Sequence, residues 1–362
     1  MRNRLFIIAG ESSGDLYGAY LIKLIKQTAP QIGIEAWGGD KMQAAGATIK
    51  THIKDLSLMG IVEVAKNIGN IQKLLKKCKN DISSYNPDAV IFIDYPGFNL
   101  RIAKWVKEQN IPTIQYISPK VWAWKESRIK TIKAVIDELI CIFPFEIDFY
   151  KKHKLDVHYF GNPLGKLIKE SLPSVLEKKT NFPTIGIMPG SRKQELARIM
   201  PVLVDFINQH KAHEFLIGQM PIIPEHLYLK NQVLNVNVQY IIDKPYDVIH
   251  SADVLINTSG TITLETLLLN KPQVVVYKAH ALAYQVFKKL VKLNYISLPN
   301  IIAEKNMVKE LLQDKCTVQN ISKAVDDLIN NPKQEDLQEI VKKLEVKDER
   351  MLVELLTKKK VT

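Results

Sequence analysis

A lone carboxylate, Asp94, ends the apolar run AVIFID at 89–94 and is followed by Tyr95 and Pro96. In open α/β sheets, ligands bind just beyond the carboxyl ends of the strands, so this side chain is expected at the rim of a cleft. Partial burial there raises the pKa of a carboxyl group and makes it a usable general base. The alternative is an N-cap for a helix over 99–109, but Asn99 is better placed for that. We predict that Asp94 is catalytic.

A polar turn, GESSGD at 10–15, follows the first apolar run of the chain. Ser12 with Asp15 three residues later resembles a capping box, and the glycines allow a ligand to approach the backbone. The carboxylates of Glu11 and Asp15 and the hydroxyls of Ser12 and Ser13 favour a polar ligand such as a sugar, against the alternative of an ordinary tight turn. The spacing is not GxGxxG, which disfavours a dinucleotide-dependent dehydrogenase.

Two turns in the second half have the composition of phosphate sites. The first, PGSR at 189–192, precedes a helical pattern, so Ser191, Arg192 and the backbone N–H groups could receive a phosphate, although Arg on a first turn is often only solvated. The second contains Ser259, Gly260 and Thr261 at another strand-to-helix junction, where the helix dipole favours a diphosphate.

Glu265 lies one helical turn beyond that second junction and on the same face of the helix. A carboxylate repels a phosphate unless it binds a neighbouring diol, and ribose hydroxyls supply one. A phosphate-binding turn combined with this glutamate therefore predicts a nucleotide-sugar site.

The elements that must position these loops alternate along the whole chain. Short apolar runs typical of strands alternate with helical patterns at 14–27, 61–79, 99–109, 193–209 and 261–269, which predicts βαβ units on parallel sheets. The expected strands are 4–9, 32–37, 88–93, 112–117, 137–143, 156–160, 184–188, 214–218, 236–241, 253–257 and 273–277.

The length of 362 residues suits two domains. The pattern lapses into a charged stretch at 166–183, which places the boundary there: domain 1–170, joined by a C-terminal helix at about 334–362, and domain 180–333. After about 305 we expect helices at 307–313, 318–330 and 334–357 and no further strand.

The chain carries 50 Lys and Arg against 38 Asp and Glu, a formal charge of +12. This excess favours anionic partners, which include nucleic acid, an anionic membrane surface and phosphorylated substrates. No recognition-helix, RRM or OB signature is visible, so we predict no nucleic-acid partner. The N-terminal apolar run is too short for a signal peptide, and three widely spaced cysteines suit a reducing cytoplasm.

Several motifs occur in an order that resembles lipid-A-disaccharide synthases: GESSGD at 10–15, MGIVEV at 59–64, IDYPGFN at 93–99, SPKVWAW at 118–124, PGSR at 189–192, SGT at 259–261 with Glu265, and SLPN at 297–300. The resemblance covers residues 4 to about 330, and SPKVWAW is its most specific part. It implies an α/β GT-B fold, in which two Rossmann-like, doubly wound parallel-sheet domains face a cleft and a C-terminal helix crosses back to the first domain.

The resemblance also implies an activity. UDP-2,3-diacylglucosamine would be the donor and 2,3-diacylglucosamine 1-phosphate the acceptor, with no cofactor and no essential metal. Asp94 would be the base, Arg192 and residues 259–261 would stabilise the diphosphate, and Glu11, Ser13 and Asp15 would hold sugar hydroxyls, with Asn300 reaching in from the second domain.

Two positions depart from the family. Gly97 stands where the family usually has an acidic or polar residue, and the expected GHPL reads GNPL, so Asn162 is given no catalytic role. The main alternative is another GT-B enzyme acting on UDP-N-acetylglucosamine, either a peptidoglycan transferase or a 2-epimerase, and the tryptophan motif speaks against both. The oligomeric state stays open, a homodimer included.

Residues 61–79 also predict where the protein meets lipid. An apolar stripe rimmed by lysines suits a helix lying in an anionic membrane interface, here the inner face of the inner membrane. The alternative is a helix packed on its own sheet with a solvated basic face, and residues 281–293 are a second candidate. The predicted membrane contacts are Val62, Ile68, Ile71, Lys73, Lys76 and Lys77.

Overall fold

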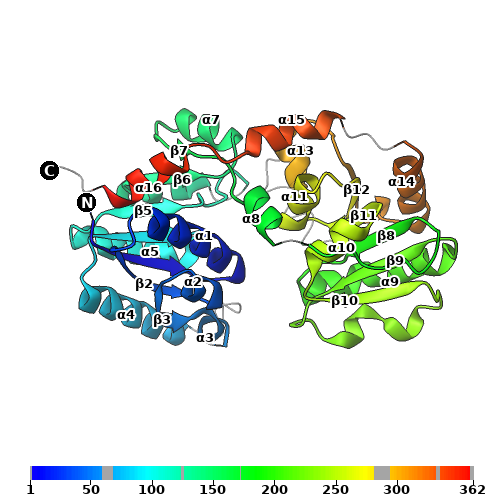
Figure 1. Cartoon of the computed structure of the whole chain (residues 1–362), viewed down its shortest axis with the longest axis horizontal. Helices are drawn as coiled ribbons and strands as arrows, with labels where there is room; N and C mark the ends of the chain where they lie inside the picture. The colour runs from blue at the N-terminus through cyan, green and yellow to red at the C-terminus, as the bar shows by residue number, and fades with distance from the viewer. Residues whose placement is uncertain are drawn as a thin grey trace. The chain divides into compact units, whose positions relative to one another are not determined.

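The computed structural model describes residues 2–58, 68–123, 126–171, 173–280, 294–331 and 335–358. The chain forms two compact units, one of residues 1–163 with 346–362 and the other of residues 164–345 (Figure 1). Each unit has one parallel β-sheet with helices around it, so the predicted α/β class with two Rossmann-like sheets is confirmed.

The first unit contains a seven-stranded sheet of order β3-β2-β1-β4-β5-β6-β7. Its strands are β1 (Arg4–Ala9), β2 (Gly33–Gly38), β3 (Thr48–His52), β4 (Ala89–Ile93), β5 (Thr113–Tyr116), β6 (Glu138–Cys141) and β7 (His158–Tyr159). Its helices are α1 (Ser12–Thr28), α2 (Asp40–Ala44), α3 (Ile53–Leu58), α4 (Ile68–Tyr85), α5 (Pro96–Glu108), α6 (Ile129–Val135), α7 (Phe145–Lys152) and α16 (Glu349–Thr357).

The second unit contains a six-stranded sheet of order β10-β9-β8-β11-β12-β13. Its strands are β8 (Thr184–Met188), β9 (Glu214–Gln219), β10 (Val238–Ile242), β11 (Val254–Thr258), β12 (Gln273–Tyr277) and β13 (Lys309–Leu312). Its helices are α8 (Leu164–Glu170), α9 (Lys193–Gln209), α10 (Pro245–Ser251), α11 (Thr261–Leu268), α13 (Leu298–Ala303), α14 (Val318–Asn330) and α15 (Glu335–Leu344).

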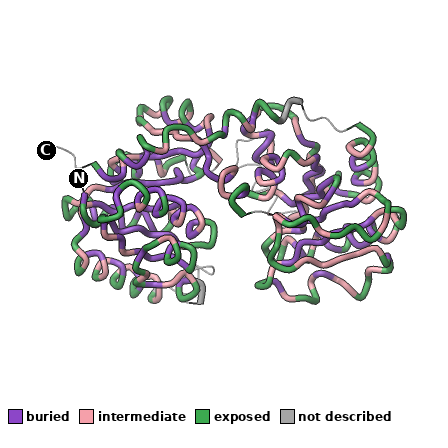
Figure 2. Tube along the Cα trace, in the orientation of Figure 1, coloured by how far each residue is buried: buried purple, intermediate pink, exposed green. Residues whose placement is uncertain are grey.

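The central strands are buried along nearly their whole length because helices cover both faces of each sheet (Figure 2). In both sheets the strand order reverses beside the first strand of the unit, between β1 and β4 and between β8 and β11. Loops that leave these neighbouring strands at their carboxyl ends diverge from the reversal point, where open α/β sheets bind ligands. The sheet order therefore selects the turns after β1, β4, β8 and β11.

Two edge strands differ from the sequence prediction. The helix expected at 307–313 is wrong, because Lys309–Leu312 pairs with β12 as strand β13. Strand β3 was not predicted at all, since Thr48–His52 is a polar segment at the other sheet's edge. Both strands pair on one side only, so their sequences lack the apolar run of a central strand.

The C-terminal segment also differs from the expected single helix over 334–357. It forms α15 and α16, with Asp348 between them in the left-handed region at φ 55°. Helix α15 belongs to the second unit, whereas α16 packs on α1 in the first unit, although it is the last helix of the chain (Figure 1). Tyr20 of α1 donates a hydrogen bond to Glu349 at 2.6 Å.

Candidate functional site

The turn after β4 holds Asp94 in a strained backbone. Asp94 and Tyr95 both have positive φ, at 43° and 48°, before Pro96 begins α5. Such residues cost about 1–3 kcal/mol each and persist only where the surroundings fix them. Asn99 supplies part of that fixing, because its side-chain amide donates to the carbonyl oxygens of Ile93 at 3.3 Å and Asp94 at 2.8 Å. Asn99 is therefore not the N-cap that the sequence suggested; the helix begins three residues earlier.

The Asp94 carboxyl group has the environment of a general base. Burial raises its pKa, while the positive charge of Lys120 and a hydrogen bond from the Tyr95 backbone N–H oppose the rise. The residue is only partly buried, so its carboxylate is open to a ligand. A raised pKa with partial access is what proton removal from a hydroxyl near neutral pH requires.

The turn after β1 lies against the Asp94 turn, because β1 and β4 are neighbours with Ala9 opposite Ile93. A side chain on Gly10 would clash with the Tyr95 ring. Burial together with the negative charge of Glu11 raises the pKa of Tyr95 to about 12. Glu11 and Ser13 are exposed at the start of α1. The structure thus brings Glu11 beside the Asp94 turn.

Asp15 has a different task from the predicted sugar contact. It is 4% exposed, and its carboxylate accepts hydrogen bonds from the backbone N–H groups of Gly39 at 2.7 Å, Lys41 at 3.1 Å and Met42 at 3.1 Å. These N–H groups begin α2, so Asp15 satisfies a helix N-terminus. No side-chain cap forms between Ser12 and Asp15 at the start of α1 either. We therefore drop Asp15 from the substrate contacts.

The loop after β5 adds a residue that the sequence analysis did not select. Residues 113–119 and Val121 are buried, whereas Lys120 is exposed, and its charge acts on Asp94. The rule that selected Asp94, reading the residues just after each strand, applies equally to the β5 loop. There the sequence indicated only the family motif SPKVWAW, which contains the lysine.

The two departures from the family pattern differ in their surroundings. Gly97 is exposed on the first turn of α5, and a Cβ added there would meet no atom within 4 Å. A larger residue at this position is therefore sterically allowed, and the glycine is not required by packing. Asn162 is 1% exposed near the end of the first unit's main segment.

In the second unit, the turns after β8 and β11 touch. Gly190 has φ 106°, and a Cβ there would lie 2.9 Å from the Thr258 hydroxyl oxygen. That hydroxyl in turn donates to the carbonyl oxygen of Met188 at 3.3 Å. Glycine is required at this close approach because only it combines the left-handed backbone with the space available. The two predicted phosphate turns therefore lie side by side.

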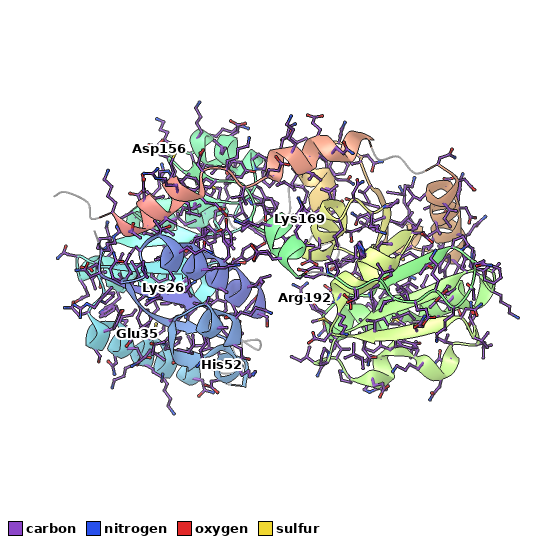
Figure 3. The ribbon with its side chains drawn as sticks, viewed as in Figure 1. Lys26, Glu35, His52, Asp156, Lys169 and Arg192 are labelled. Atoms are coloured by element: carbon purple, nitrogen blue, oxygen red, sulfur yellow. The ribbon has the colours of Figure 1, made fainter. Side chains whose placement is uncertain are left out.

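Arg192 is placed at the start of α9, in the first of these turns. Its side chain, labelled in Figure 3, is 77% exposed and donates to the Glu195 carboxylate at 2.8 Å. The charges of Arg192 and Glu195 also act on the phenol of Tyr277 at the end of β12, whose pKa is raised mainly by burial. The guanidinium group is thus held at the carboxyl edge of the sheet, and its planar fork of five donors suits an anion.

The second turn presents its backbone openly. Gly260 is exposed with open space where a Cβ would be, and Thr261 is exposed as the first residue of α11. The Ser259 hydroxyl donates to the carbonyl oxygen of Ile296 at 2.8 Å, which ties this turn to the segment before α13. Because its hydroxyl hydrogen is engaged, Ser259 offers a ligand its backbone N–H more readily than its side chain.

Glu265 lies one turn into α11 and is partly buried. Burial raises the pKa of its carboxyl group to about 7, and a long hydrogen bond from the Tyr246 hydroxyl, at 3.4 Å, opposes the rise. This carboxylate has acceptor capacity for two further hydroxyl groups.

Asn300 does not fit the role predicted for it. It is fully buried, and its amide donates to the Val308 carbonyl at 2.8 Å and to the Glu310 carboxylate at 2.9 Å. Its side-chain oxygen accepts from the N–H groups of Met307 at 2.8 Å and Val308 at 2.7 Å. Every polar atom of this amide is therefore used to hold the approach to β13.

Helix α4 can be compared with the membrane prediction only in part, because Val62 and the side chain of Ile68 lie outside what the structure describes. Leu74, Cys78 and Ile82 of α4 pack into the core of the first unit. The opposite face exposes Lys73 and Lys76, with Ile71 partly buried. No helix among the described residues is long and apolar enough to cross a membrane.

Lys77 differs from its neighbours on α4. Its ammonium group donates to the Thr51 hydroxyl and to the Asp81 carboxylate at 3.2 Å, and it lies 5.2 Å from the centre of the Trp37 ring. Trp37 also donates to Asp81 at 2.9 Å. Lys77 therefore ties α4 to the sheet, which does not fit the predicted membrane contact.

Comparisons with known proteins bear on the family and the fold. A family model described as Lipid-A-disaccharide synthetase matches residues 5–361. The Lipid-A-disaccharide synthase of Idiomarina loihiensis is 36% identical over 358 residues, 95% of this chain and 94% of that protein. The corresponding protein of Trichlorobacter lovleyi is 32% identical over 340 residues, 91% of this chain and 88% of that one.

Solved structures show the same architecture at low identity. The UDP-GlcNAc 2-epimerase of Neisseria meningitidis, bound to UDP-GlcNAc, superposes with a TM-score of 0.65 at 13% identity, covering 98% of this chain and 99% of that one. At that identity the likeness establishes the GT-B fold alone. The family match and the full-length relatives decide further, and the chain belongs to the lipid-A-disaccharide synthase family.

Proposed function

We propose that this protein transfers 2,3-diacylglucosamine from its UDP derivative to 2,3-diacylglucosamine 1-phosphate, releasing UDP and a disaccharide 1-phosphate. Family membership supports the substrates. The environment of Asp94 supports the proposed reaction. This partly buried carboxyl group has a raised pKa and lies on a strained turn at the point where the strand order reverses.

The proposed mechanism inverts the anomeric carbon. Asp94 removes the proton from the acceptor 6-hydroxyl, whose oxygen forms a bond to C1 of the donor as the bond from C1 to the diphosphate breaks. Arg192 and the N–H groups at 259–261 stabilise the charge that grows on the departing UDP. Glu265 accepts hydrogen bonds from the ribose diol, while Glu11 and Ser13 bind sugar hydroxyls.

No metal takes part in this mechanism. A guanidinium group and a helix N-terminus supply the positive potential that a divalent ion supplies in other nucleotide-sugar enzymes. EDTA should therefore leave the rate unchanged, and a loss of activity that Mg²⁺ restores would contradict this part of the proposal.

The direct test is incubation of the purified protein with the acylated donor and acceptor. UDP and a disaccharide phosphate should appear in equal amounts. Incubation with UDP-N-acetylglucosamine, alone and with a peptidoglycan lipid precursor, should yield neither an epimer nor a transfer product. Either of those products without the acylated disaccharide would favour the alternative GT-B activities.

We further propose that the first unit reaches its lipid substrates as a peripheral protein on an anionic leaflet, through the face of α4 that carries Lys73 and Lys76. Leu74 and Cys78 pack inward, and the Lys77 ammonium group, although exposed, is engaged by Thr51 and Asp81. We therefore assign the lipid contact to the exposed Lys73 and Lys76. A lysine near an anionic membrane contributes about 1 kcal/mol.

Charge reversal tests this contact. Lys73→Glu with Lys76→Glu should abolish sedimentation with phosphatidylglycerol vesicles and leave UDP binding unchanged. The matched control is Lys130→Glu with Lys133→Glu, two exposed lysines of α6, which changes the net charge equally. Equal losses in both double variants, or vesicle binding that ignores salt, would overturn the proposal.

A further inference from the structure

A buried carboxylate in the first unit, that of Glu146, is not used by the proposed mechanism. Glu146 lies in the first turn of α7 and is 1% exposed. One of its oxygens accepts from the Ser118 hydroxyl and from the Trp122 indole N–H at 3.0 Å. The other accepts from the backbone N–H groups of Ile142 at 3.2 Å and Phe143 at 3.0 Å.

These donors come from two different loops. Ser118 and Trp122 belong to the loop after β5, whereas Ile142 and Phe143 belong to the loop after β6. The neighbouring Tyr150 of α7 adds a hydrogen bond to the carbonyl oxygen of Pro119 at 3.2 Å. The Trp122 ring packs edge-on against Phe145, with ring centres 4.9 Å apart. Glu146 is therefore the point at which the β5 loop is fastened to α7.

The end of β5, from which this loop leaves, is fastened to Asp94. Gln115 donates to the carbonyl oxygens of Ile117 at 3.1 Å and Asp94 at 3.4 Å, and the Asp94 N–H donates to the Tyr116 carbonyl at 3.2 Å. Lys120 lies between Ser118 and Trp122, the two loop residues that donate to Glu146, and is the exposed residue of the otherwise buried stretch 113–121. A long side chain keeps a defined position only when its backbone is fixed.

We propose that Glu146 is a positioning residue of the Asp94 site: its carboxylate fixes the loop 118–122, and this loop holds the Lys120 ammonium group beside Asp94. The inference rests on the proposed role of Asp94 as base. Lys120 supplies the positive charge that keeps the Asp94 carboxylate ionised, and Glu146 supplies the anchor.

The other titratable groups around the two carboxylates stay neutral near pH 7. Beside Asp94, burial raises the pKa of Tyr95 to about 12 and that of Tyr116 well above its usual range, so both phenols are neutral. Among the described residues, the charge of Lys120 acts on Asp94 and that of Glu11 acts on Tyr95. Around Glu146, burial raises the pKa values of Cys141, Tyr150 and Tyr159. Burial raises the pKa of Glu146 itself to about 7, against the pull of its four donors.

Glu146→Gln is the informative change because it keeps the size of the side chain. Its carbonyl oxygen can still accept from Ile142 and Phe143, and its amide can donate to the Ser118 hydroxyl. The Trp122 indole only donates, so it would face another donor and release the loop at that point. Adding Trp122→Phe removes this conflict and should restore the loop.

The test is the pH dependence of kcat/KM, whose acidic limb reports the essential base of the free enzyme. Lys120→Gln and Glu146→Gln should each move that limb to higher pH by about one unit, giving about a tenfold loss on the acidic side. The double variant should be no worse than Lys120→Gln alone, because the two residues act through one interaction. Glu146→Gln with Trp122→Phe should recover most of the shift.

Lys133→Gln and Glu108→Gln, which remove exposed charges elsewhere in the first unit, are the matched controls and should leave the limb in place. UDP binding and the near-UV circular dichroism show whether each variant is folded. If Glu146→Gln does not fold, Lys120→Gln still tests the charge on Asp94, and Trp122→Phe alone should leave the limb close to the wild-type position.

Different outcomes refute the positioning role of Glu146 and the role of Asp94 as base. If Asp94→Asn is inactive but the limb stays unmoved in Lys120→Gln, Asp94 remains the base and the positioning role is wrong. A limb that disappears in Glu146→Gln alone would mean that the limb reports Glu146 and not Asp94, which also overturns the inference. Activity that survives Asp94→Asn refutes the base.

Discussion

Two glutamates, one in each unit, have nearly the same acidity and opposite surroundings. Burial raises the pKa of Glu146 and of Glu265 to about 7. Glu146 accepts four hydrogen bonds from its own unit, whereas the hydrogen bond found for Glu265 among the described residues is the long one from Tyr246. The acidity alone does not distinguish an anchor from a binding group, but the number of donors does.

The two carboxylates also differ in the hydrogen bonds that they can accept from a ligand. The oxygens of Glu146 have no need of a ligand, so its removal costs folding. Glu265 has spare acceptor capacity and gains partners when a diol arrives, so its removal costs binding. Perturbed pKa values thus indicate functional sites only when they are considered together with hydrogen-bond satisfaction.

Glu146→Ala should have the largest effect on stability. It leaves the Trp122 indole and two backbone N–H groups buried without their acceptor, at about 1–3 kcal/mol for each unsatisfied donor, so the first unit should lose about 3 kcal/mol or more. All four tryptophans, at positions 37, 105, 122 and 124, lie in the first unit, so their fluorescence in a urea titration reports this unit. Glu108→Ala is the exposed control, and equal urea midpoints for the two variants would show that Glu146 is not an anchor.

Arg192→Ala and Glu265→Ala should weaken UDP binding by about 1.5–3 kcal/mol each, the usual value of a hydrogen bond to a charged group. Titration calorimetry measures this directly, and Glu146→Gln should bind UDP as the wild type does. Arg198→Ala, a neighbouring arginine of α9, controls for the loss of positive charge. Unchanged affinity in both test variants would place the nucleotide site elsewhere.

Glu265→Gln should have the smallest effect, and it should stabilise the protein where Glu146→Ala destabilises it. The folded-state pKa of about 7 exceeds the ordinary value of 4.5, so the folded chain binds more protons between these values and its stability falls as the pH rises through them. The glutamine variant has no carboxyl group to ionise, so it does not lose this stability. The second unit should therefore be more stable than wild type by about 1–3 kcal/mol at pH 8, with no difference below pH 4.

Tryptophan fluorescence does not report the second unit, which contains no tryptophan. Far-UV circular dichroism, or hydrogen exchange of α11, measures this change instead. A variant that is less stable than wild type at pH 8 would show that Glu265 is an anchor like Glu146, and the contrast between the two glutamates would disappear.

The sequence was sufficient for the parts of the fold that depend on apolar runs. Central strands such as Arg4–Ala9 and Thr184–Met188 match their predicted ranges because both faces are buried. The edge strands β3 and β13 could not be recognised in the same way. Each pairs with a neighbouring strand on one side only, so its sequence lacks a long apolar run.

The candidate site shows the same division. Asp94, Glu11 and Arg192 lie at strand-to-helix turns, as the rule for strand ends predicts, and Glu265 lies one helical turn beyond such a turn. Asp15 lies in the first turn of α1 and Asn300 in α13, but their hydrogen bonds go to α2 and to the segment before β13, contacts that only the tertiary structure reveals. A polar residue in a loop is ambiguous until its partners are known.

The central claim is that Asp94 removes the proton while the second unit holds the nucleotide. The most direct measurement is turnover of Asp94→Asn with the acylated donor and acceptor, beside its UDP affinity by calorimetry, with Asp148→Asn as an exposed control. The account predicts a fall in turnover of about 100-fold or more at unchanged UDP affinity, because asparagine keeps size and hydrogen bonding but not basicity. Turnover within a few-fold of wild type would contradict it.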